Sequence, residues 1–466
     1  MNGRVAAIPQ PSKIIPPDEP LPPLRLIRTV VRNPIEAWPK PVYEQPLYRS
    51  RFMGRETVFV TDPDLVRQVL VDQADAFVKA ESLRRALQPV LGDAILTADG
   101  ARWRWQRQAA APIFRPDQIR TYVPAMIAAA ERRRELWLSR VGEEVNVAQE
   151  MLHTTFDIIA ETMLSGRGGI DVDRVERGAT DYSDSISWVI LLTLLRAPRW
   201  MPYPGRGRVE RARDYLREEV ERMVAERRRS DQGRNDLVTR LLAVTDPETS
   251  RSMSDRDVVD NLLTFLVAGH ETTALALTWT FYLLSLHPEI TERVVQEIET
   301  VTQGGSLCEE HIEALSYTRQ VVQEAMRLYP PAPVVVRAAI RDVYLGNELI
   351  RAGSPTYIPV YAIHRHQLLW DEPDTFDPDR FAPEAVKARH RFAYLPFGAG
   401  PRICIGMSFA LLEAVVILAT LLRSVRLELR PNYVPELKQR ITLRPAAGMP
   451  MRLDRRTHSW MTDAAS

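Results

Sequence analysis

The sequence predicts a mainly α-helical protein with small peripheral β-sheets, folded as one large domain. Helical spacing of apolar residues dominates the chain up to about residue 330, whereas strand signals are short and lie near the two ends. The 466 residues, 45% of them hydrophobic, are enough to bury a large core. No internal repeat, low-complexity tract or flexible linker divides the sequence, which favours one domain over several.

The N-terminal 46 residues are predicted to be a lead-in segment. Eleven prolines fall within residues 1–46, which is typical of an extended segment that wraps a surface. The domain itself is expected to span residues 47–466. The first residues lack the continuous apolar stretch of a signal peptide or a membrane anchor, so no transmembrane anchor is expected.

The strand signals come in short groups. Alternating residues on both sides of Gly54 predict a β-hairpin over 47–60. The pair Gly346-Asn347 predicts the turn of a second hairpin within 343–350. Further strands are expected near the C-terminus, at 425–430, 441–445 and 449–453.

One long helix is predicted from Ser254 to the stop at His287-Pro288. Ser254 is a good N-cap, with Asp257 three residues on. The helix would have roughly 32 residues and a length of about 48 Å, enough to cross the whole domain. Such a helix should be buried and apolar throughout.

The middle of this helix, "AGHETT", is polar instead. Gly269 costs about 1 kcal/mol relative to alanine in a helix. In one interpretation, Thr272 and Thr273 bond back to carbonyls one turn earlier and Glu271 faces water. In the other, the helix is opened beside a reaction centre, with an acid and an alcohol placed to pass protons.

Two further patterns are weak when taken alone. Glu324 and Arg327 are three residues apart on a helix that must end before Pro330-Pro331, which is typical of an exposed ion pair. The stretch "FDPDRF" presents Arg380 in a turn.

Charge and cysteine content narrow the class of protein. Lys plus Arg number 61 against 60 Asp plus Glu, so the sequence offers no electrostatic footprint for nucleic acid. The two cysteines, Cys308 and Cys404, cannot form a disulfide framework, which favours a reducing compartment and the cytoplasm. Cys308 is interpreted as a small buried hydrophobe.

Cys404 lies in "FGAGPRICIG" (397–406), a glycine-rich loop that runs into a helix. The helix dipole and free backbone N–H groups there are expected to favour a thiolate. With no second cysteine or histidine in the segment, zinc and iron–sulfur sites are poorly supported. A single thiolate, by contrast, is enough to hold heme iron.

The loop resembles the heme-binding signature F-G-x-G-x-R-x-C-x-G of the cytochrome P-450 family at every fixed position. The resemblance continues along the chain in the family's order, with "WRWQR", "AGHETT", the E-x-x-R pair and "FDPDRF". It implies a P-450 fold around heme b (iron protoporphyrin IX), with Cys404 as the axial ligand. Residues that match the family's heme-contacting and structural positions are Trp103, Arg107, Arg337 and Arg402 at the propionates, Phe397 under the ring, and the triad Glu324, Arg327 and Arg380.

The resemblance also implies a function. A heme-thiolate monooxygenase inserts one atom of O2 into an apolar organic substrate, with Glu271 and Thr272 delivering protons and Ala268 and Gly269 opening the helix for dioxygen. The two electrons would come from a separate ferredoxin or flavodoxin with its NAD(P)H reductase. The alternatives are a heme-thiolate isomerase or dehydratase, a peroxygenase, and a non-catalytic heme-binding protein.

The substrate pocket is expected to be apolar. By resemblance, it includes Phe265, Ala268, Val334 and Val335, together with residues 82–96 and 446–449. These residues suit a terpenoid, fatty acyl or aromatic compound alike.

Overall fold

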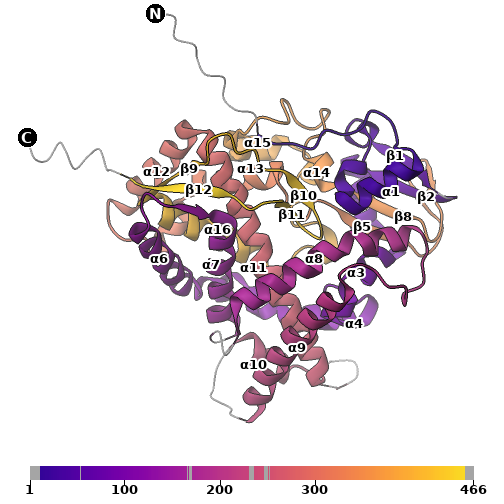
Figure 1. Ribbon diagram of the computed structural model, residues 1–466, viewed down its shortest axis with the longest axis horizontal. Coiled ribbons are helices and arrows are strands. Elements are labelled where there is room, and N and C mark those ends of the chain that lie inside the picture. The colour runs from indigo at the N-terminus through magenta and orange to yellow at the C-terminus, as the bar shows by residue number, and fades with distance from the viewer. Residues whose placement is uncertain are drawn as a thin grey trace, which may run out of the picture.

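The computed structural model describes residues 11–52, 54–164, 166, 170–229, 236–245, 250 and 252–456. Helices form most of this structure and small sheets lie toward its edges (Figure 1), so the predicted fold class is confirmed. Within the described ranges, no helix has the length and apolar character needed to cross a membrane. The helices are α1 (Pro23–Arg32), α2 (Pro63–Arg67), α3 (Glu81–Leu91), α4 (Gly100–Ala110), α5 (Pro116–Arg120), α6 (Val123–Ser139), α7 (Val147–Met163), α8 (Val172–Leu194), α9 (Arg206–Arg229), α10 (Leu237–Ala243), α11 (Asp255–Leu286), α12 (Pro288–Thr302), α13 (Ser316–Leu328), α14 (Val360–Ile363), α15 (Pro383–Ala388) and α16 (Met407–Leu422).

The strands form one five-stranded sheet and three smaller sheets. The largest sheet has the order β1-β2-β8-β5-β3, and the others pair β4-β12-β9, β6-β7 and β10-β11. The strands are β1 (Leu47–Phe52), β2 (Arg55–Val60), β3 (Phe77–Lys79), β4 (Glu144–Asn146), β5 (Val335–Ala339), β6 (Val343–Leu345), β7 (Glu348–Ile350), β8 (Pro355–Ile358), β9 (Val425–Leu429), β10 (Leu437–Gln439), β11 (Leu443–Pro445) and β12 (Pro450–Arg455).

These strands confirm both predicted hairpins. The first, β1–β2, pairs antiparallel from Leu47–Val60 to Phe52–Arg55. The second, β6–β7, turns at Gly346, which has the positive φ of +55° that the prediction requires. The strands β9, β11 and β12 lie where the C-terminal signals indicated. The sequence analysis missed β3, β4, β5, β8 and β10, because strands of three to five residues are too short to show alternation.

Helix α11 runs through the middle of the molecule (Figure 1) and packs against α7, α9, α13 and α16. Ser254 and Asp257 form the complete reciprocal capping box, and the helix ends at His287, directly before Pro288. The predicted bounds are therefore confirmed.

The expected opening of this helix at Ala268 and Gly269 is not observed, because α11 is continuous from Asp255 to Leu286. Gly269 has another reason to be glycine: a Cβ there would lie 2.5 Å from Ile159 Cδ1 of α7. The residue allows close packing of two helices rather than a break in one.

The N-terminal segment is extended only in part. Residues 11–22 contain no helix and are anchored to the domain, since Tyr361 Oη accepts a bond from Ile14 N (3.0 Å) and Tyr329 Oη donates to Ser12 O (2.7 Å). The interpretation as an extended segment is wrong for 23–43, where α1 and two 3₁₀ turns form. Proline at the first position of each of these helical segments, or directly after it, starts helices instead of preventing them.

A buried acid lies where α16 packs on α11. Glu413 of α16 is fully buried. Burial raises the pKa of Glu413 to about 8, and the Thr273 hydroxyl of α11 opposes the shift. Between a pH of about 4.3 and a pH of about 8, Glu413 is therefore mainly neutral in the folded protein, whereas a free glutamate is ionised.

This shift predicts a pH-dependent stability. Below a pH of about 4.3 the carboxyl is neutral in both states, and its contribution to stability is complete. As the pH rises toward 8, only the unfolded state ionises, so stability falls by roughly 1.4 kcal/mol per pH unit until the folded-state pKa is passed. Glu413→Gln has no carboxyl to ionise, so its stability should not fall with pH for this reason. We therefore expect the melting temperature of Glu413→Gln, relative to that of the wild type, to rise between pH 5.5 and pH 8.

The matched control is Glu384→Gln, since the Glu384 side chain is 84% exposed. A stability difference between Glu413→Gln and the wild type that is the same at both pH values would contradict this account.

Candidate active site

The loop 397–406 presents Cys404 to a large cavity. Gly398 and Gly400 have φ values of +69° and +71°, which favour glycine. A Cβ on Gly400 would also lie 1.9 Å from the carbonyl oxygen of Leu70, so the loop passes against the backbone there. Cys404 N donates to Phe397 O (2.9 Å), which closes the loop, and α16 starts after Gly406.

The Cys404 thiol is accessible from the cavity. Desolvation by the surrounding protein raises its pKa, while the N–H of Gly406 and the charge of Arg107 lower it. The Gly406 N–H at the start of α16 therefore acts in the predicted direction, toward the thiolate, but in the protein chain alone it does not offset the desolvation of the thiol.

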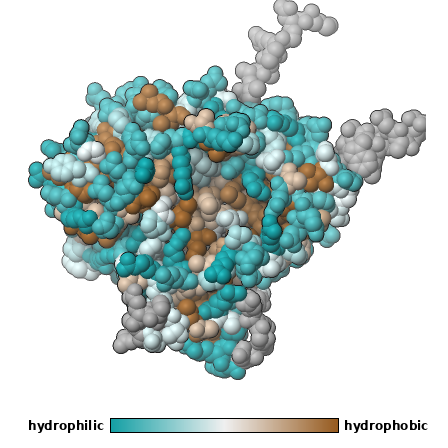
Figure 2. Space-filling view, turned by 180° about the vertical axis from the view of Figure 1, so that it is seen from behind, coloured by the Kyte–Doolittle hydropathy of each residue, from teal (hydrophilic) through white to brown (hydrophobic). Residues whose placement is uncertain are grey.

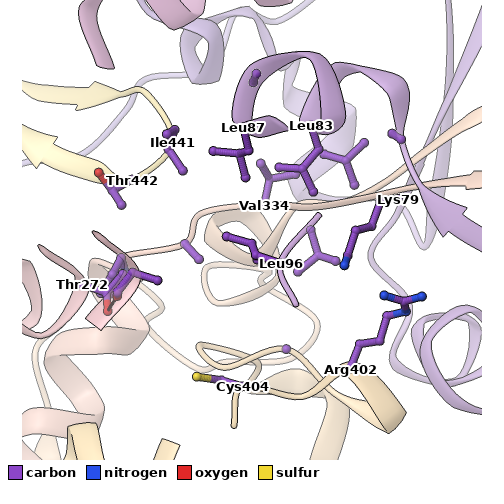
Figure 3. Close-up of a pocket in the computed structure, with 18 of the residues that line it drawn as sticks. Lys79, Leu83, Leu87, Leu96, Thr272, Val334, Arg402, Cys404, Ile441 and Thr442 are labelled. Atoms are coloured by element: carbon purple, nitrogen blue, oxygen red, sulfur yellow. Dashed lines mark hydrogen bonds between the residues drawn. The ribbon is translucent and has the colours of Figure 1, made fainter. Parts of the chain in front are cut away.

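The cavity has a volume of about 910 Å³. In Figure 3, Cys404 lies on its floor, Thr272 lies at one side and Lys79 and Arg402 lie at the opposite side. Between them the wall is apolar and includes Leu83, Leu87, Leu96, Val334 and Ile441. On the face of the molecule shown in Figure 2, hydrophobic residues gather toward the centre of a mostly hydrophilic surface.

Positive charge is concentrated at one end of the cavity. Arg402 pairs with Asp99 (2.5 Å) and lies 4.3 Å above the Trp103 ring. Burial and the charge of Arg402 lower the pKa of Arg337 to about 10. Burial and the same arginine lower the pKa of Lys79 to about 6. The cations destabilise one another, so this end of the cavity favours an anion.

Lys79 is a residue that the sequence analysis missed. It is 6% exposed and donates to the carbonyls of Ile95 (3.0 Å) and Ala98 (2.7 Å). A lysine inside the apolar stretch "AFVKA" was the available signal, since buried lysines are rare. Arg107, which was predicted to lie at this end, donates to the carbonyl of Ile403 (2.8 Å) in the cysteine loop.

The structure brings Glu324, Arg327 and Arg380 together behind the cysteine loop. Glu324 and Arg327 are fully buried and paired through two bonds of 2.6 and 2.7 Å, so the pattern is not an exposed ion pair. Arg327 also donates to the carbonyls of His364, Pro373 and Thr375. Arg380 Nε lies 3.6 Å from Glu324 Oε1.

Glu271 and Thr272 both line the cavity from α11. The Thr272 hydroxyl donates to the carbonyl of Ala268 (2.8 Å), which is the back-bond of the first interpretation. Glu271 does not face water. It is 8% exposed, accepts a 2.6 Å bond from Thr442 and is ion-paired with Arg444. No sequence motif indicated these two partners.

Phe265, Ala268, Val334 and Val335 line the cavity, as do several residues between 82 and 96. The prediction for residues 446–449 is wrong. Met449 is buried in the core beside β4, where its N–H bonds Asn146, and the C-terminal part of the cavity wall is residues 439–442 instead.

The fold and the cavity beside the cysteine loop agree with a heme enzyme, and comparison with known proteins gives the family. The cytochrome P450 family model matches residues 40–449. The chain therefore belongs to the cytochrome P450 family, an enzyme family whose cofactor is heme b, and it is of the monooxygenase class.

Two bacterial relatives and one solved structure illustrate the similarity. The chain is 35% identical over 377 residues to the cyclooctat-9-en-7-ol 5-monooxygenase of Streptomyces melanosporofaciens, covering 79% of each chain. It is 31% identical over 371 residues to the pentalenene oxygenase of Streptomyces avermitilis, covering 79% of this chain and 81% of the relative. The crystal structure of the cytochrome P450DA heme domain aligns with a TM-score of 0.82 and 26% identity, covering 96% of this chain and 99% of that one.

The cavity fits heme b on two counts. The basic side chains Lys79, Arg337 and Arg402 suit the two propionates of the cofactor, since a carboxylate beside Lys79 would favour its charged form. Among the described residues, no group of three or more His, Cys, Asp or Glu could hold a metal ion, so Cys404 would act as a single protein ligand to iron carried by a porphyrin.

This assignment predicts a spectroscopic signature. The reduced protein with carbon monoxide should show the strongly red-shifted Soret band of thiolate ligation, and Cys404→Ser should lose that band. The control is Cys308→Ser, since Cys308 lies outside the cavity beside His311 (Sγ–Nδ1 3.1 Å). Loss of the band in Cys308→Ser and its retention in Cys404→Ser would rule out Cys404 as the ligand.

The buried pair behind the loop predicts a stability effect. Glu324→Ala leaves Arg327 buried without its carboxylate, which costs about 3–5 kcal/mol. We expect loss of heme content and a much lower unfolding midpoint. Glu372→Ala, at an exposed position in the same region, should change neither; full heme content in Glu324→Ala would contradict the argument.

Proposed function

We propose that this protein hydroxylates a cyclic terpene or terpene alcohol. One atom of O2 enters a substrate C–H bond as a hydroxyl group, and the other leaves as water after two electrons and two protons are taken up. The observation that carries the proposal is that Cys404, Glu271 and Thr272 all line one mostly apolar cavity.

Heme bound in this cavity supplies the activation of dioxygen. The chain's own residues would do the rest. Cys404 would hold the iron, and Lys79, Arg337 and Arg402 would bind the propionates. Glu271 would supply a proton from the α11 side of the cavity, and the Thr272 hydroxyl would direct it toward the dioxygen.

The substrate class is inferred from the cavity wall and the relatives. Leu83, Leu87, Leu96, Val334 and Ile441 offer dispersion contacts and few hydrogen bonds, which suits a hydrocarbon skeleton. The two bacterial relatives are named for cyclooctat-9-en-7-ol and pentalenene. A terpenoid is therefore favoured over a fatty acyl or aromatic compound.

The electrons are inferred to come from a separate ferredoxin or flavodoxin with its NAD(P)H reductase. Arg104 and Arg391 are exposed, and Arg391 borders a small pocket behind the cysteine loop. A cationic surface favours an acidic carrier. Cys308 and Cys404 are not joined in a disulfide, which suits the reducing cytoplasm.

The proposal is tested by screening cyclic terpenes and terpene alcohols for a shift of the ferric Soret band. Each compound that shifts the band is then supplied with ferredoxin, reductase, NADPH and isotopically labelled O2. We expect a labelled hydroxylated product that requires both O2 and NADPH. Conversion without O2 would indicate an isomerase or dehydratase, and conversion driven by peroxide alone would indicate a peroxygenase.

The role of Thr272 predicts a change in coupling. Thr272→Ala should keep heme content and substrate binding, but more of the NADPH consumed should appear as hydrogen peroxide and less as product. If Thr272 serves only the back-bond to Ala268, stability changes slightly and the peroxide released per NADPH stays equal to that of the wild type. Thr272→Ser, which keeps the hydroxyl, is the matched control and should stay coupled.

A further inference from the structure

Residues 439–444 form the turn of the C-terminal hairpin β10–β11 and the strand residues next to it, and we call them the hairpin tip. Two of their neighbouring side chains contact the carboxylate of Glu271 in the cavity wall. Thr442 Oγ1 donates a 2.6 Å hydrogen bond to Glu271 Oε1. Arg444 Nη2 donates to the same oxygen and forms an ion pair with it. The two donors lie 171 and 173 residues from Glu271 in the sequence, so the contact exists only in the folded chain.

The carboxylate is held through one oxygen only. Both donors bond Oε1, and no residue in the described part of the chain donates to Oε2. Glu271 lies in the cavity wall next to Thr272. With Oε1 fixed, the direction of Oε2 is set by Thr442 and Arg444, and Oε2 remains to exchange a proton.

The hairpin tip is itself firmly placed. Trp279 Nε1 of α11 donates to Leu443 O (3.1 Å), and Leu443 N donates to Pro331 O (3.0 Å). Arg440 Nη1 donates to the carbonyl of Arg32 in α1 and to Ser187 Oγ in α8, both at 3.0 Å. Contacts to four separate parts of the fold hold the two donors before any substrate binds, which is the condition for preorganisation.

The hairpin tip also faces the substrate space. Ile441 and Thr442 line the cavity, and Figure 3 shows them above Thr272 on the same side of it. A substrate that fills the cavity therefore contacts the residue that holds the proton-carrying acid.

We propose that Thr442 and Arg444 are positioning residues for Glu271, which they hold with Oε2 directed for proton transfer. The proposal rests on the proposed function in one respect, that Glu271 carries protons while O2 is reduced. Without the two donors, the carboxylate samples several rotamers and is correctly oriented for a smaller fraction of the time.

The test compares Arg444→Met and Thr442→Val with the wild type, using a plant-type ferredoxin, its reductase and NADPH. Heme content, the carbon monoxide band and terpenoid-induced Soret shifts should be unchanged. NADPH oxidation should slow by about tenfold in Arg444→Met, as expected for a lost bond to a charged group. The solvent deuterium isotope effect on that rate should rise, because proton transfer becomes limiting.

The controls separate positioning from general stability. Arg444→Lys keeps the positive charge and should recover most of the rate, and Thr442→Ser keeps the hydroxyl. Arg452→Met makes the same change on β12, where the arginine side chain is 61% exposed, and should have no effect.

A double-mutant cycle decides the matter. If Arg444 acts through Glu271, Arg444→Met should slow NADPH oxidation in the wild-type background and have no further effect in Glu271→Gln. Effects that multiply in the double variant would overturn the proposal, as would an unchanged rate and isotope effect in Arg444→Met. If Arg444→Met fails to load heme, the cycle is run with Thr442→Val and Glu271→Gln. No further effect of Thr442→Val in Glu271→Gln would support the proposal, and effects that multiply would overturn it.

NADPH oxidation and peroxide release need no identified product. A wild-type enzyme that oxidises NADPH and hydroxylates no terpenoid would contradict the proposed substrate class. The cycle between Arg444 and Glu271 would still be measured, so the two failures are distinguishable.

Discussion

The structure depends on a 32-residue helix that crosses the molecule while carrying polar groups at its buried centre. Burying a polar group costs free energy unless it finds a partner, so the surroundings of α11 are built to supply partners. The hydroxyl of Thr155 on α7 reaches the carbonyl of His270, and the His270 ring in turn bonds Leu266 O. Thr273 lies against the neutral Glu413, and Glu271 is held by the C-terminal hairpin. The polar centre therefore fixes the places of α7, α16 and β10–β11.

At the end of the cavity near Lys79 and Arg402, by contrast, buried charges are not all given partners. There the chain leaves charge uncompensated: Lys79, Arg337 and Arg402 lie close together, and Asp99 is shared between Arg402 and Arg84. In the protein alone this arrangement is costly, as the lowered pKa of Lys79 shows. An anionic cofactor bound beside these side chains would remove that cost, so its binding and the folding of this region would be linked by mass action.

Features that depend on neighbouring residues, such as helix ends and turns, could be predicted from the sequence. Contacts between residues far apart in the chain could not. The ends of α11 follow from Ser254, Asp257 and the proline after it, all within the helix or next to it. The hairpins follow from glycine turns. Thr442 and Arg444 escaped prediction because they act on Glu271, 171 and 173 residues away, and nothing beside them in the chain marks that contact. Lys79 is different, since its apolar neighbours in "AFVKA" were a local signal. The cysteine loop was noticed from its own glycines and lone thiol, whereas the role of the E-x-x-R pair came only from the resemblance to the family.

The two sides of the cavity differ in how firmly their charges are held. Behind Cys404, Glu324 and Arg327 have no exposed side-chain surface, and Arg327 also donates to backbone carbonyls on two segments, at His364 and at 373–375. Such a pair cannot separate without leaving a buried charge, so it fixes the fold rigidly. Above Cys404, the side chains of Glu271 and Arg444 are 11% and 20% exposed. Glu271 borders the cavity, so this pair is less completely enclosed than the pair behind Cys404. The chain thus encloses one ion pair completely behind the cysteine loop and leaves the pair at the cavity wall partly accessible.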